Sequence, residues 1–291
     1  MTHRIRKAVI PVAGFGTRFL PVSKSVPKEM LPLVNRPIIE YVVREFVEAG
    51  IEEIIFISSS NKHALEDYFD YNNELDAALR AAGKEAQLKE SRAAAQLARF
   101  SYVHQREQLG NGHALMQAQH LIGDEPFAFA YGDDVIEARP SATAQMIETF
   151  HDHPGTIVGA IEVPRDVVNR YGIFDPEPID PNTFRVKRMI EKPSLDEAPS
   201  TLMNPGRYLF TPAIFAALDA IEPGKGGELW LADAVAKLGE SEPIYGRRIT
   251  GTYYDCGNVL EYVKAVVHFA SEDAAIGQEF SRWLKESHIN F

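Results

Sequence analysis

A glycine-rich loop near the start of the sequence carries residue types suited to binding a polyphosphate. Gly14 and Gly16 would let the backbone approach phosphate oxygens closely, and Arg18 and Lys28 could neutralise their charge. No acidic residue lies between residues 14 and 28 to cancel these cations. Residues 1–28 hold six basic groups and no acid, whereas the whole chain has 41 acidic and 30 basic residues and a net charge of −11. A basic island in an acidic protein favours one small, highly anionic ligand.

The loop differs from two common nucleotide-binding fingerprints. The third glycine of a dinucleotide-binding loop would fall at Phe19, which argues against an NAD-binding oxidoreductase. No Gly-Lys-Ser/Thr follows, so the loop is not a Walker A motif either. A lone Gly-x-Gly can also be a tight turn and nothing more, and the loop by itself leaves that alternative open.

Two adjacent carboxylates, Asp133 and Asp134, follow the predicted strand 127–131. Open α/β sheets bind ligands beyond the carboxyl ends of their strands, so an aspartate there is well placed for Mg²⁺. This ion takes only one or two protein carboxylates together with phosphate oxygens and water. A simple helix cap is the alternative, above all for Asp134. The sequence offers no Cys/His cluster that would favour zinc.

The pattern of apolar residues predicts the elements that must position these groups. In the first part of the chain, strands are expected at 7–13, 54–57, 100–104 and 127–131, and helices at 37–49, 60–69, 74–98 and from 112 to 120. In the second part, strands are expected at 156–163, 184–190, 208–210 and 244–253, followed by a helical tail at 259–285. Alternating strands and helices predict an α/β fold with a Rossmann-like, mixed, mostly parallel sheet flanked by helices.

Composition excludes several classes of protein. A chain this acidic is a poor candidate for binding nucleic acid or an anionic membrane surface. No apolar run approaches the roughly 20 residues that a membrane helix needs, and no signal peptide is expected. The single cysteine, Cys256, excludes an intrachain disulfide and is expected to be an inert buried thiol. The expected location is the cytoplasm.

A series of motifs resembles the sugar-nucleotide pyrophosphorylases. Residues 13–18 and 27–32 carry the first match, and the Lys-Glu-Met-Leu-Pro form at 28–32, with 38–50 after it, is most similar to the members that use UTP and glucose 1-phosphate. Further matches follow in order at 66–70, 74–75, 105, 110–114, 132–134, 171–172, 191–193, 206–208 and 255–258. Each motif is modest, but their order along nearly the whole chain is specific.

The resemblance implies one nucleotidyltransferase domain over residues 1–291. It implies a nucleotide-binding half at about 1–135, a sugar-binding half at about 136–257 and C-terminal helices at 258–291. The activity it implies is Mg²⁺-dependent transfer of UMP from UTP to glucose 1-phosphate with release of pyrophosphate. It also implies a homodimer or homotetramer.

The resemblance assigns roles to individual residues. It implies catalytic roles for Arg18, Lys28 and Lys192, and metal ligation by Asp133 and Asp255. The residues implied to contact the nucleotide are Ala13, Gly14, Gly16, Thr17, Glu29, Gln105, Gly110 and Gly112. Those implied to contact the sugar are Asp134, Glu162, Gly172, Glu191 and Gly206. The Gln105 amide offers a donor and an acceptor that match the edge of uracil, and the glycines after it would let the base lie against bare backbone.

Other functions stay open at this point. Another pyrimidine triphosphate, such as dTTP or CTP, or a galactose or N-acetylglucosamine phosphate could be the substrate. A catalytically silent sugar-nucleotide-binding regulator is a further alternative, although it would not need the cationic and metal-binding residues as a set. The chain departs from the family at Trp230 and Ala232, where polar residues are usual, and in the proline-rich stretch 175–182. Both departures fall in the sugar-binding half and bear on the choice of sugar.

Overall fold

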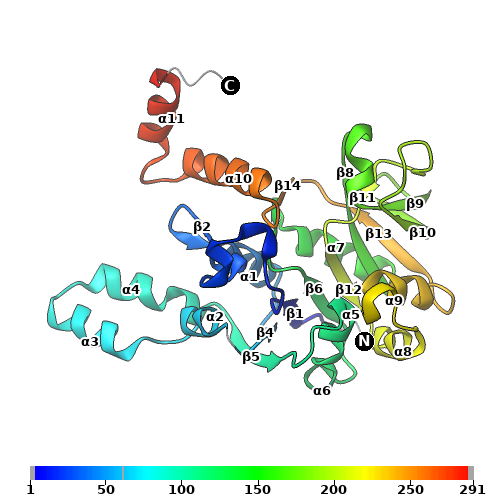
Figure 1. Cartoon of the computed structure of the whole chain (residues 1–291), viewed down its shortest axis with the longest axis horizontal. Helices are drawn as coiled ribbons and strands as arrows, with labels where there is room; N and C mark the ends of the chain where they lie inside the picture. The colour runs from blue at the N-terminus through cyan, green and yellow to red at the C-terminus, as the bar shows by residue number, and fades with distance from the viewer. Residues whose placement is uncertain (1–3, 61, 288–291) are drawn as a thin grey trace.

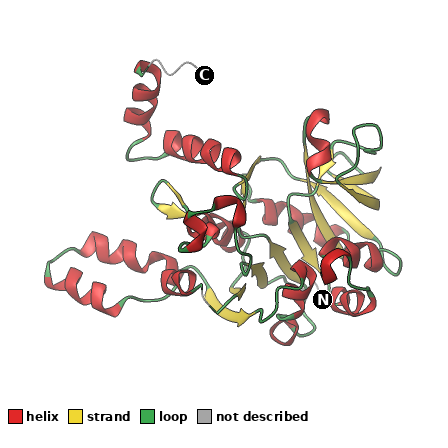
Figure 2. Cartoon of the chain, in the orientation of Figure 1, coloured by secondary structure: helices red, strands yellow, loops and turns green. Residues whose placement is uncertain are grey.

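A ten-stranded mixed sheet runs through the protein and carries helices on both faces (Figures 1 and 2). The computed structural model describes residues 4–60 and 62–287. The strands are β1 (Lys7–Pro11), β2 (Pro32–Leu33), β3 (Arg36–Pro37), β4 (Glu53–Ser58), β5 (Arg99–His104), β6 (Phe127–Ala130), β7 (Asp134–Glu137), β8 (Thr156–Glu162), β9 (Gly172–Pro178), β10 (Thr183–Glu191), β11 (Leu202–Met203), β12 (Arg207–Phe210), β13 (Ile244–Arg248) and β14 (Thr252–Asp255). The helices are α1 (Ile38–Glu48), α2 (His63–Tyr68), α3 (Asn73–Ala81), α4 (Glu85–Ala93), α5 (Gly110–Met116), α6 (Gln119–Ile122), α7 (Ala142–Asp152), α8 (Ala213–Ala220), α9 (Leu231–Leu238), α10 (Val259–Glu272) and α11 (Gly277–Glu286).

Four strands of the first half form a parallel block, and the three inner ones, β1, β4 and β6, are buried on both faces. Their order is β6-β1-β4-β5, and every pairing among them is parallel. Ala8 and Ile10 of β1 enter the core beneath α1 and α7, whereas Val9 enters the core beneath α5, α8 and α9. This two-residue alternation between two cores explains why the strands read as continuous apolar runs. The predicted α/β fold is confirmed.

The second half extends the same sheet with mostly antiparallel pairings. Strand β12 pairs antiparallel with both β6 and β8, and so joins the two halves. Beyond it the order is β8-β13-β10-β9-β11, in which only the β8–β13 pair is parallel. Strand β9 runs through the proline-rich stretch as far as Pro178, and helices α7, α8 and α9 cover this half. None of these four elements was predicted.

A separate two-stranded sheet is the main departure from the predicted elements. The strand expected at 244–253 is two strands, β13 in the large sheet and β14 in a small sheet with β7. Between them Gly251 passes so close to β7 that a Cβ would stand 2.7 Å from the carbonyl oxygen of Glu137. Asp134 begins β7 and lies opposite Asp255 in the antiparallel register, so its predicted role as a helix cap is wrong.

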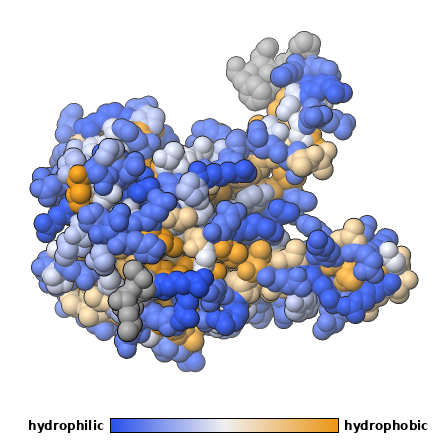
Figure 3. All heavy atoms as spheres, turned by 180° about the vertical axis from the view of Figure 1, so that it is seen from behind, coloured by the Kyte–Doolittle hydropathy of each residue, from blue (hydrophilic) through white to orange (hydrophobic). Residues whose placement is uncertain are grey.

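Two helical predictions are divided by turns in the structure. The helix expected at 74–98 is the hairpin α3–α4, because Gly83 adopts a left-handed φ of +66°. The tail is α10 and α11, interrupted where the Asp273 carboxylate accepts backbone N–H groups from Ala275 and Ile276. Both pairs of helices project from the body (Figures 1 and 3). Helix α2 covers only 63–68 of the predicted 60–69, a range that includes residue 61, which is not described.

The environment of Cys256 and the lengths of the helices bear on two expectations from composition. Cys256 is buried in the apolar cluster beneath α10, as expected. Among the described residues, no helix has the length and apolar composition that a membrane span requires.

Candidate active site

Two polar cavities meet beyond the carboxyl ends of the parallel strands. The first has a volume of about 240 Å³ and is lined by Pro11, Ala13, Gly14, Lys28, Glu29, Gln105, Gln108, Gly110, Asn111, Ala114, Tyr131, Asp133 and Glu228. The second has a volume of about 330 Å³ and is lined by Arg18, Asn111, Tyr131, Asp133, Asp134, Arg170, Tyr171, Gly172, Met189, Glu191, Lys192, Asn204, Gly206, Tyr208, Trp230, Ala232, Tyr253 and Asp255. Asn111, Tyr131 and Asp133 line both, so one molecule in each cavity would meet at these residues.

The glycine-rich loop brings Lys28 to this junction. Three short 3₁₀ turns carry the chain from Thr17 to Met30. Gly16 adopts a φ of +64°, and a Cβ there would stand 3.3 Å from the side chain of Lys28. The ammonium of Lys28 forms an ion pair of 2.5 Å with the Asp133 carboxylate. Burial would lower the pKa of Lys28, but Asp133 and Glu29 raise it above its ordinary value, so Lys28 stays charged.

Glu29 has a protein cation as its partner. Its side chain is almost fully buried and lies 3.0 Å from the ammonium of Lys62, which also donates to the carbonyl of Val12. Burial raises the pKa of Glu29, and Lys62 opposes that shift. The pair ties the glycine-rich loop to the end of β1, while Glu29 still lines the first cavity. Positioning of the loop is therefore part of what Glu29 does.

Gln105 is oriented by two hydrogen bonds at the end of β5. Its Nε2 donates to the carbonyl of Gly110 at 3.1 Å and lies 3.0 Å from Nδ1 of His113. Because Nε2 is occupied as a donor, Oε1 is the atom left to accept a hydrogen bond, and no described residue donates to it. Gln105 lines the first cavity, as does Gly110.

Four predicted residues lie outside both cavities. Gly112 packs under Leu229, whose carbonyl accepts its N–H at 2.9 Å, so packing accounts for this glycine, and its contact with a base stays a prediction. Glu162 is exposed at the end of β8, where it pairs with Leu202 of β11 and accepts a hydrogen bond from Thr201, and its sugar contact stays a prediction. Gly16 packs on Lys28, and Thr17 is exposed at the start of a 3₁₀ turn.

The two predicted metal ligands converge on Gly257. Carboxylate oxygens of Asp133 and Asp255 both lie within 3.1 Å of the point where a Cβ on Gly257 would stand. Burial raises the pKa of Asp255, and the neighbouring Asp133 raises it further. Two carboxylates around a space that a side chain would fill are a donor set that fits Mg²⁺, which takes its remaining ligands from phosphate and water. Within residues 4–60 and 62–287 no group of three or more Asp, Glu, His or Cys side chains could hold a metal.

The side chain of Asp134 is held by a hydrogen bond within the protein. It accepts a hydrogen bond of 2.6 Å from the hydroxyl of Tyr253. Burial, with a contribution from Asp133, raises the pKa of Asp134 to about 8. Asp134 lines the second cavity, where a sugar contact was predicted.

The second cavity collects the remaining predicted residues. Lys192 follows β10 with a left-handed φ of +48°, and its ammonium lies 3.7 Å from the carboxylate of Glu191. Both side chains are more than 45% exposed, so this ion pair is weak and can open. A Cβ on Gly172 would stand 3.0 Å from Glu191, and Gly206 adopts a φ of +70° beneath Tyr131. Gly172, Gly206 and Arg18 all line this cavity.

Sequence reasoning missed several polar residues that line the cavities. Asn111 donates to the hydroxyl of Tyr131 at 2.7 Å and accepts from the N–H of Leu231 at 2.8 Å, which links α5 to the start of α9. Asn204 donates to the hydroxyl of Tyr208. Asn111 lies between the two predicted glycines 110 and 112, and this position could have indicated it as a cavity residue. Nothing in the sequence indicates Asn204 as one.

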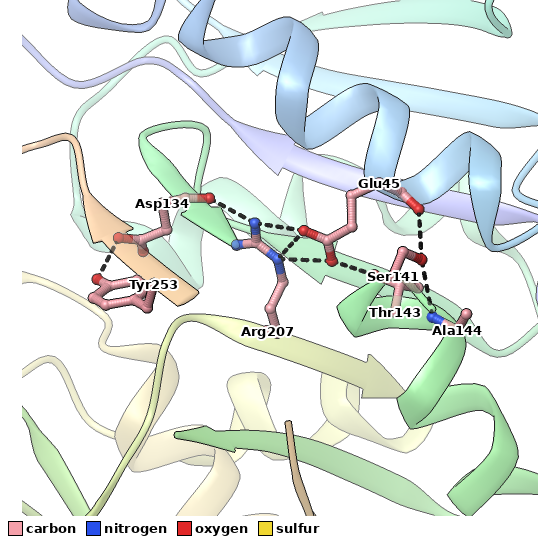
Figure 4. Close-up of polar contacts among 7 residues, drawn as sticks. All are labelled: Glu45, Asp134, Ser141, Thr143, Ala144, Arg207 and Tyr253. Atoms are coloured by element: carbon pink, nitrogen blue, oxygen red, sulfur yellow. Dashed lines mark hydrogen bonds and ion pairs between the residues drawn. The ribbon is translucent and has the colours of Figure 1, made fainter. Parts of the chain in front are cut away.

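A buried ion pair contacts the main chain of Asp134 (Figure 4). Arg207 of β12 and Glu45 of α1 are joined by hydrogen bonds of 2.9–3.1 Å, with side-chain exposures of only 1% and 4%. The same Arg207 guanidinium donates to the main-chain carbonyl of Asp134 at 2.5 Å. The hydroxyl of Thr143 donates to Glu45 at 2.7 Å. One ion pair therefore ties together α1, β12, β7 and α7.

Comparison with known proteins points to one family. The nucleotidyl transferase family model matches residues 7–272. The UTP–glucose-1-phosphate uridylyltransferase of Bacillus subtilis (strain 168) is 43% identical over 282 residues, which cover 97% of this chain and 97% of that relative. The solved structure of UTP-bound UGPase from Acinetobacter baumannii has a TM-score of 0.90 at 37% identity, covering 97% of this chain and 99% of that one. A UDP-glucose pyrophosphorylase complexed with UDP-glucose has a TM-score of 0.83 at 37% identity, covering 93% of this chain and 100% of that one.

Breaking the buried ion pair should destabilise the protein strongly. We expect Arg207→Met to lower the free energy of unfolding by about 3–5 kcal/mol, because Glu45 would stay buried without its partner. Adding Glu45→Leu should recover much of that loss, since the buried charge is then removed as well. Urea unfolding followed by circular dichroism measures both, with the exposed pair partner Lys237→Ala as a control that should change stability by less than about 1 kcal/mol. Equal stability of Arg207→Met and the unaltered chain would contradict this account.

Proposed function

The chain belongs to the nucleotidyl transferase family, and from this premise we propose that it transfers UMP from UTP to glucose 1-phosphate with release of pyrophosphate. The named relatives support this choice of substrates, since one is a UTP–glucose-1-phosphate uridylyltransferase and two solved structures hold UTP or UDP-glucose. The observation that carries the proposal is the meeting of two polar cavities at Asp133, with Lys28 on one side and Arg18 on the other. The first cavity would take UTP and the second the sugar phosphate.

The reaction needs no nucleophile from the protein. A phosphate oxygen of glucose 1-phosphate attacks the α-phosphorus of UTP in line, a new P–O bond forms, and pyrophosphate leaves with its electron pair. Lys28, in the first cavity, holds the β- and γ-phosphates, and Arg18, which lines the second cavity together with Asp133, offsets the negative charge where the two substrates meet. Lys192 draws the sugar phosphate toward the α-phosphorus against the repulsion between the two anions. Positioning and charge neutralisation therefore supply most of the catalysis.

A divalent cation fits between Asp133 and Asp255. Both carboxylates border the space left by Gly257, and Mg²⁺ suits two hard oxygen ligands beside phosphates. When bound, Mg²⁺ would polarise the α-phosphate and offset negative charge. The ion pair between Lys28 and Asp133 places a cation next to a proposed metal ligand. Lys28 and a metal ion held by Asp133 could therefore neutralise one polyphosphate together.

The test of the proposed function is a grid of nucleoside triphosphates against sugar 1-phosphates, scored by release of pyrophosphate. The expected result is the highest kcat/KM for UTP with glucose 1-phosphate. Higher values for dTTP, for CTP or for a galactose or N-acetylglucosamine phosphate would replace these substrates. Binding of UDP-glucose without any turnover would identify a sugar-nucleotide-binding regulator instead.

Three further expectations stay predictions: the homodimer or homotetramer, the division into halves at about residue 135, and the cytoplasmic location.

Gln105 is expected to select the base. Uracil presents an N3–H donor to an acceptor such as Oε1 of Gln105, whereas cytosine presents a bare acceptor nitrogen there. Gln105→Ala should lower the ratio of kcat/KM for UTP over CTP roughly tenfold, as expected for about 1–3 kcal/mol of lost discrimination. Gln117→Ala is the matched control, because Gln117 also contacts His113 but lies outside both cavities. An unchanged UTP/CTP ratio in Gln105→Ala would sink the assignment.

Lys192 is expected to act on the sugar side. Lys192→Ala should raise the KM for glucose 1-phosphate and slow turnover, lowering kcat/KM roughly 10- to 100-fold, since a charged hydrogen bond to phosphate is lost. The dissociation constant for UTP, measured by calorimetry, should stay within about twofold. Lys187→Ala, on the same strand but exposed and outside the cavity, should change neither quantity. Weakened UTP binding with a normal KM for the sugar phosphate would move Lys192 to the nucleotide side.

The metal site gives a further prediction. Chelation with EDTA should abolish activity and added Mg²⁺ should restore it. Asp133→Asn and Asp255→Asn should each lower kcat by about two orders of magnitude or more, because a metal ligand loses its charge. Asp152→Asn, at the exposed end of α7, is the control and should be unaffected. Full activity in EDTA, or Mg²⁺ bound away from both aspartates in a crystal of the UDP-glucose complex, would refute the assignment.

A further inference from the structure

An exposed indole lines the second cavity. Five aromatic side chains contribute to its lining, and Trp230 is the exposed one, with 39% of its surface accessible. Three of the four tyrosines, Tyr131, Tyr208 and Tyr253, have their hydroxyls bonded to Asn111, Asn204 and Asp134. Trp230 makes no side-chain hydrogen bond to any described residue. An indole of this size, left open inside a polar cavity, is available to a ligand.

The backbone on both sides of Trp230 is fixed. The N–H of Leu229 donates to the carbonyl of Leu109 at 2.8 Å, and the carbonyl of Leu229 accepts from Gly112 at 2.9 Å. The N–H of Leu231 donates to the Asn111 side chain at 2.8 Å. One edge of the indole lies beside Gly224. A Cβ added to Gly224 would stand 3.5 Å from Cδ1 of Trp230. The residue is therefore mounted on a constrained stretch of chain rather than on a free loop.

The cavity has an apolar part and a polar part. Trp230 and Ala232, two positions apart at the start of α9, both line it, while Leu231 between them is buried. Glu191 and Lys192 line the same cavity with charged groups. A hexopyranose has a matching division, since its ring faces carry C–H groups and its rim carries hydroxyls. Sites that combine an aromatic surface with a few polar groups fix the orientation of such ligands.

We propose that Trp230 is the platform against which the ring of the hexose 1-phosphate lies, and that it contributes affinity on the sugar side only. This inference rests on the proposed function. The indole covers one C–H face of the ring, while Glu191 and Lys192 take polar groups at the rim and the phosphate. The nucleotide, in the first cavity, does not touch Trp230, which is absent from the lining of that cavity.

Kinetics of two Trp230 variants test the platform. Trp230→Ala should raise the KM for glucose 1-phosphate about tenfold and leave the KM for UTP within about twofold. Trp230→Phe keeps an aromatic face and should raise the KM for glucose 1-phosphate less than threefold. Trp283→Phe, on the projecting helix α11, is the matched control and should behave like the unaltered chain. An unchanged KM for glucose 1-phosphate in Trp230→Ala would overturn the proposal.

Fluorescence gives a second readout that does not depend on turnover. The chain has two tryptophans, so Trp283→Phe leaves Trp230 as the only indole emitter. Saturating UDP-glucose should change the emission of this variant, and UTP alone should change it much less. Trp230→Phe, which keeps Trp283, should show no change with either ligand. Emission that ignores UDP-glucose, or that responds equally to UTP, would overturn the proposal even if Trp230→Ala failed to fold.

The two hypotheses fail differently. If the unaltered chain releases no pyrophosphate from UTP and any sugar 1-phosphate, the proposed function is wrong and this inference falls with it. If the unaltered chain is active but Trp230→Ala keeps its KM values, the function stands and the platform is wrong.

Discussion

The buried ion pair between Arg207 and Glu45 is the constraint on which the site depends. A charge removed from water needs a partner, and losing that partner leaves it buried and uncompensated. Glu45 therefore fixes α1 against β12, the strand that joins the two halves of the sheet. Arg207 also holds the main chain of Asp134, one residue after Asp133. The Arg207 guanidinium thus holds both the strand that joins the two halves and the main chain next to Asp133, where the two cavities meet.

Further polar pairs surround the Arg207–Glu45 ion pair and extend to the residues that line the two cavities. The hydroxyl of Tyr253 donates to Asp134 from β14, and the register of β7 and β14 places Asp255 opposite Asp134. On the other side, Lys28 pairs with Asp133, and Lys62 pairs with Glu29. Cations and carboxylates thus alternate across the site, although the chain as a whole is strongly acidic.

The sequence was sufficient for the parts of the structure that follow from local patterns. The three inner parallel strands read as apolar runs because both faces are buried, and the positions of the glycine-rich loop and Asp133 after strands indicated a ligand site, whereas Gln105 and Lys192 were singled out by the family resemblance. Glu45 and Arg207 could not be found as a pair, because each looks like an ordinary charged residue and 162 positions separate them. Strand β7 is only four residues long, too short to show an alternation, so the small sheet was missed. The family resemblance implied contacts for Gly112 and Glu162, but Gly112 packs against Leu229 and Glu162 is exposed at the end of β8, and both lie outside the cavities.

The two cavities differ in how firmly their side chains are held, and this difference bears on specificity. The first is lined by glycines, the buried Glu29 and a Gln105 whose amide nitrogen is already bonded, so its polar groups are held in place. The second presents Glu191 and Lys192 on half-exposed side chains, together with an open indole. Long, solvated side chains can follow a different hydroxyl pattern at low energetic cost. Substitutions that change the sugar are therefore expected to be tolerated more easily than substitutions that change the nucleotide, and Trp230, on its fixed backbone, is the rigid element on the sugar side.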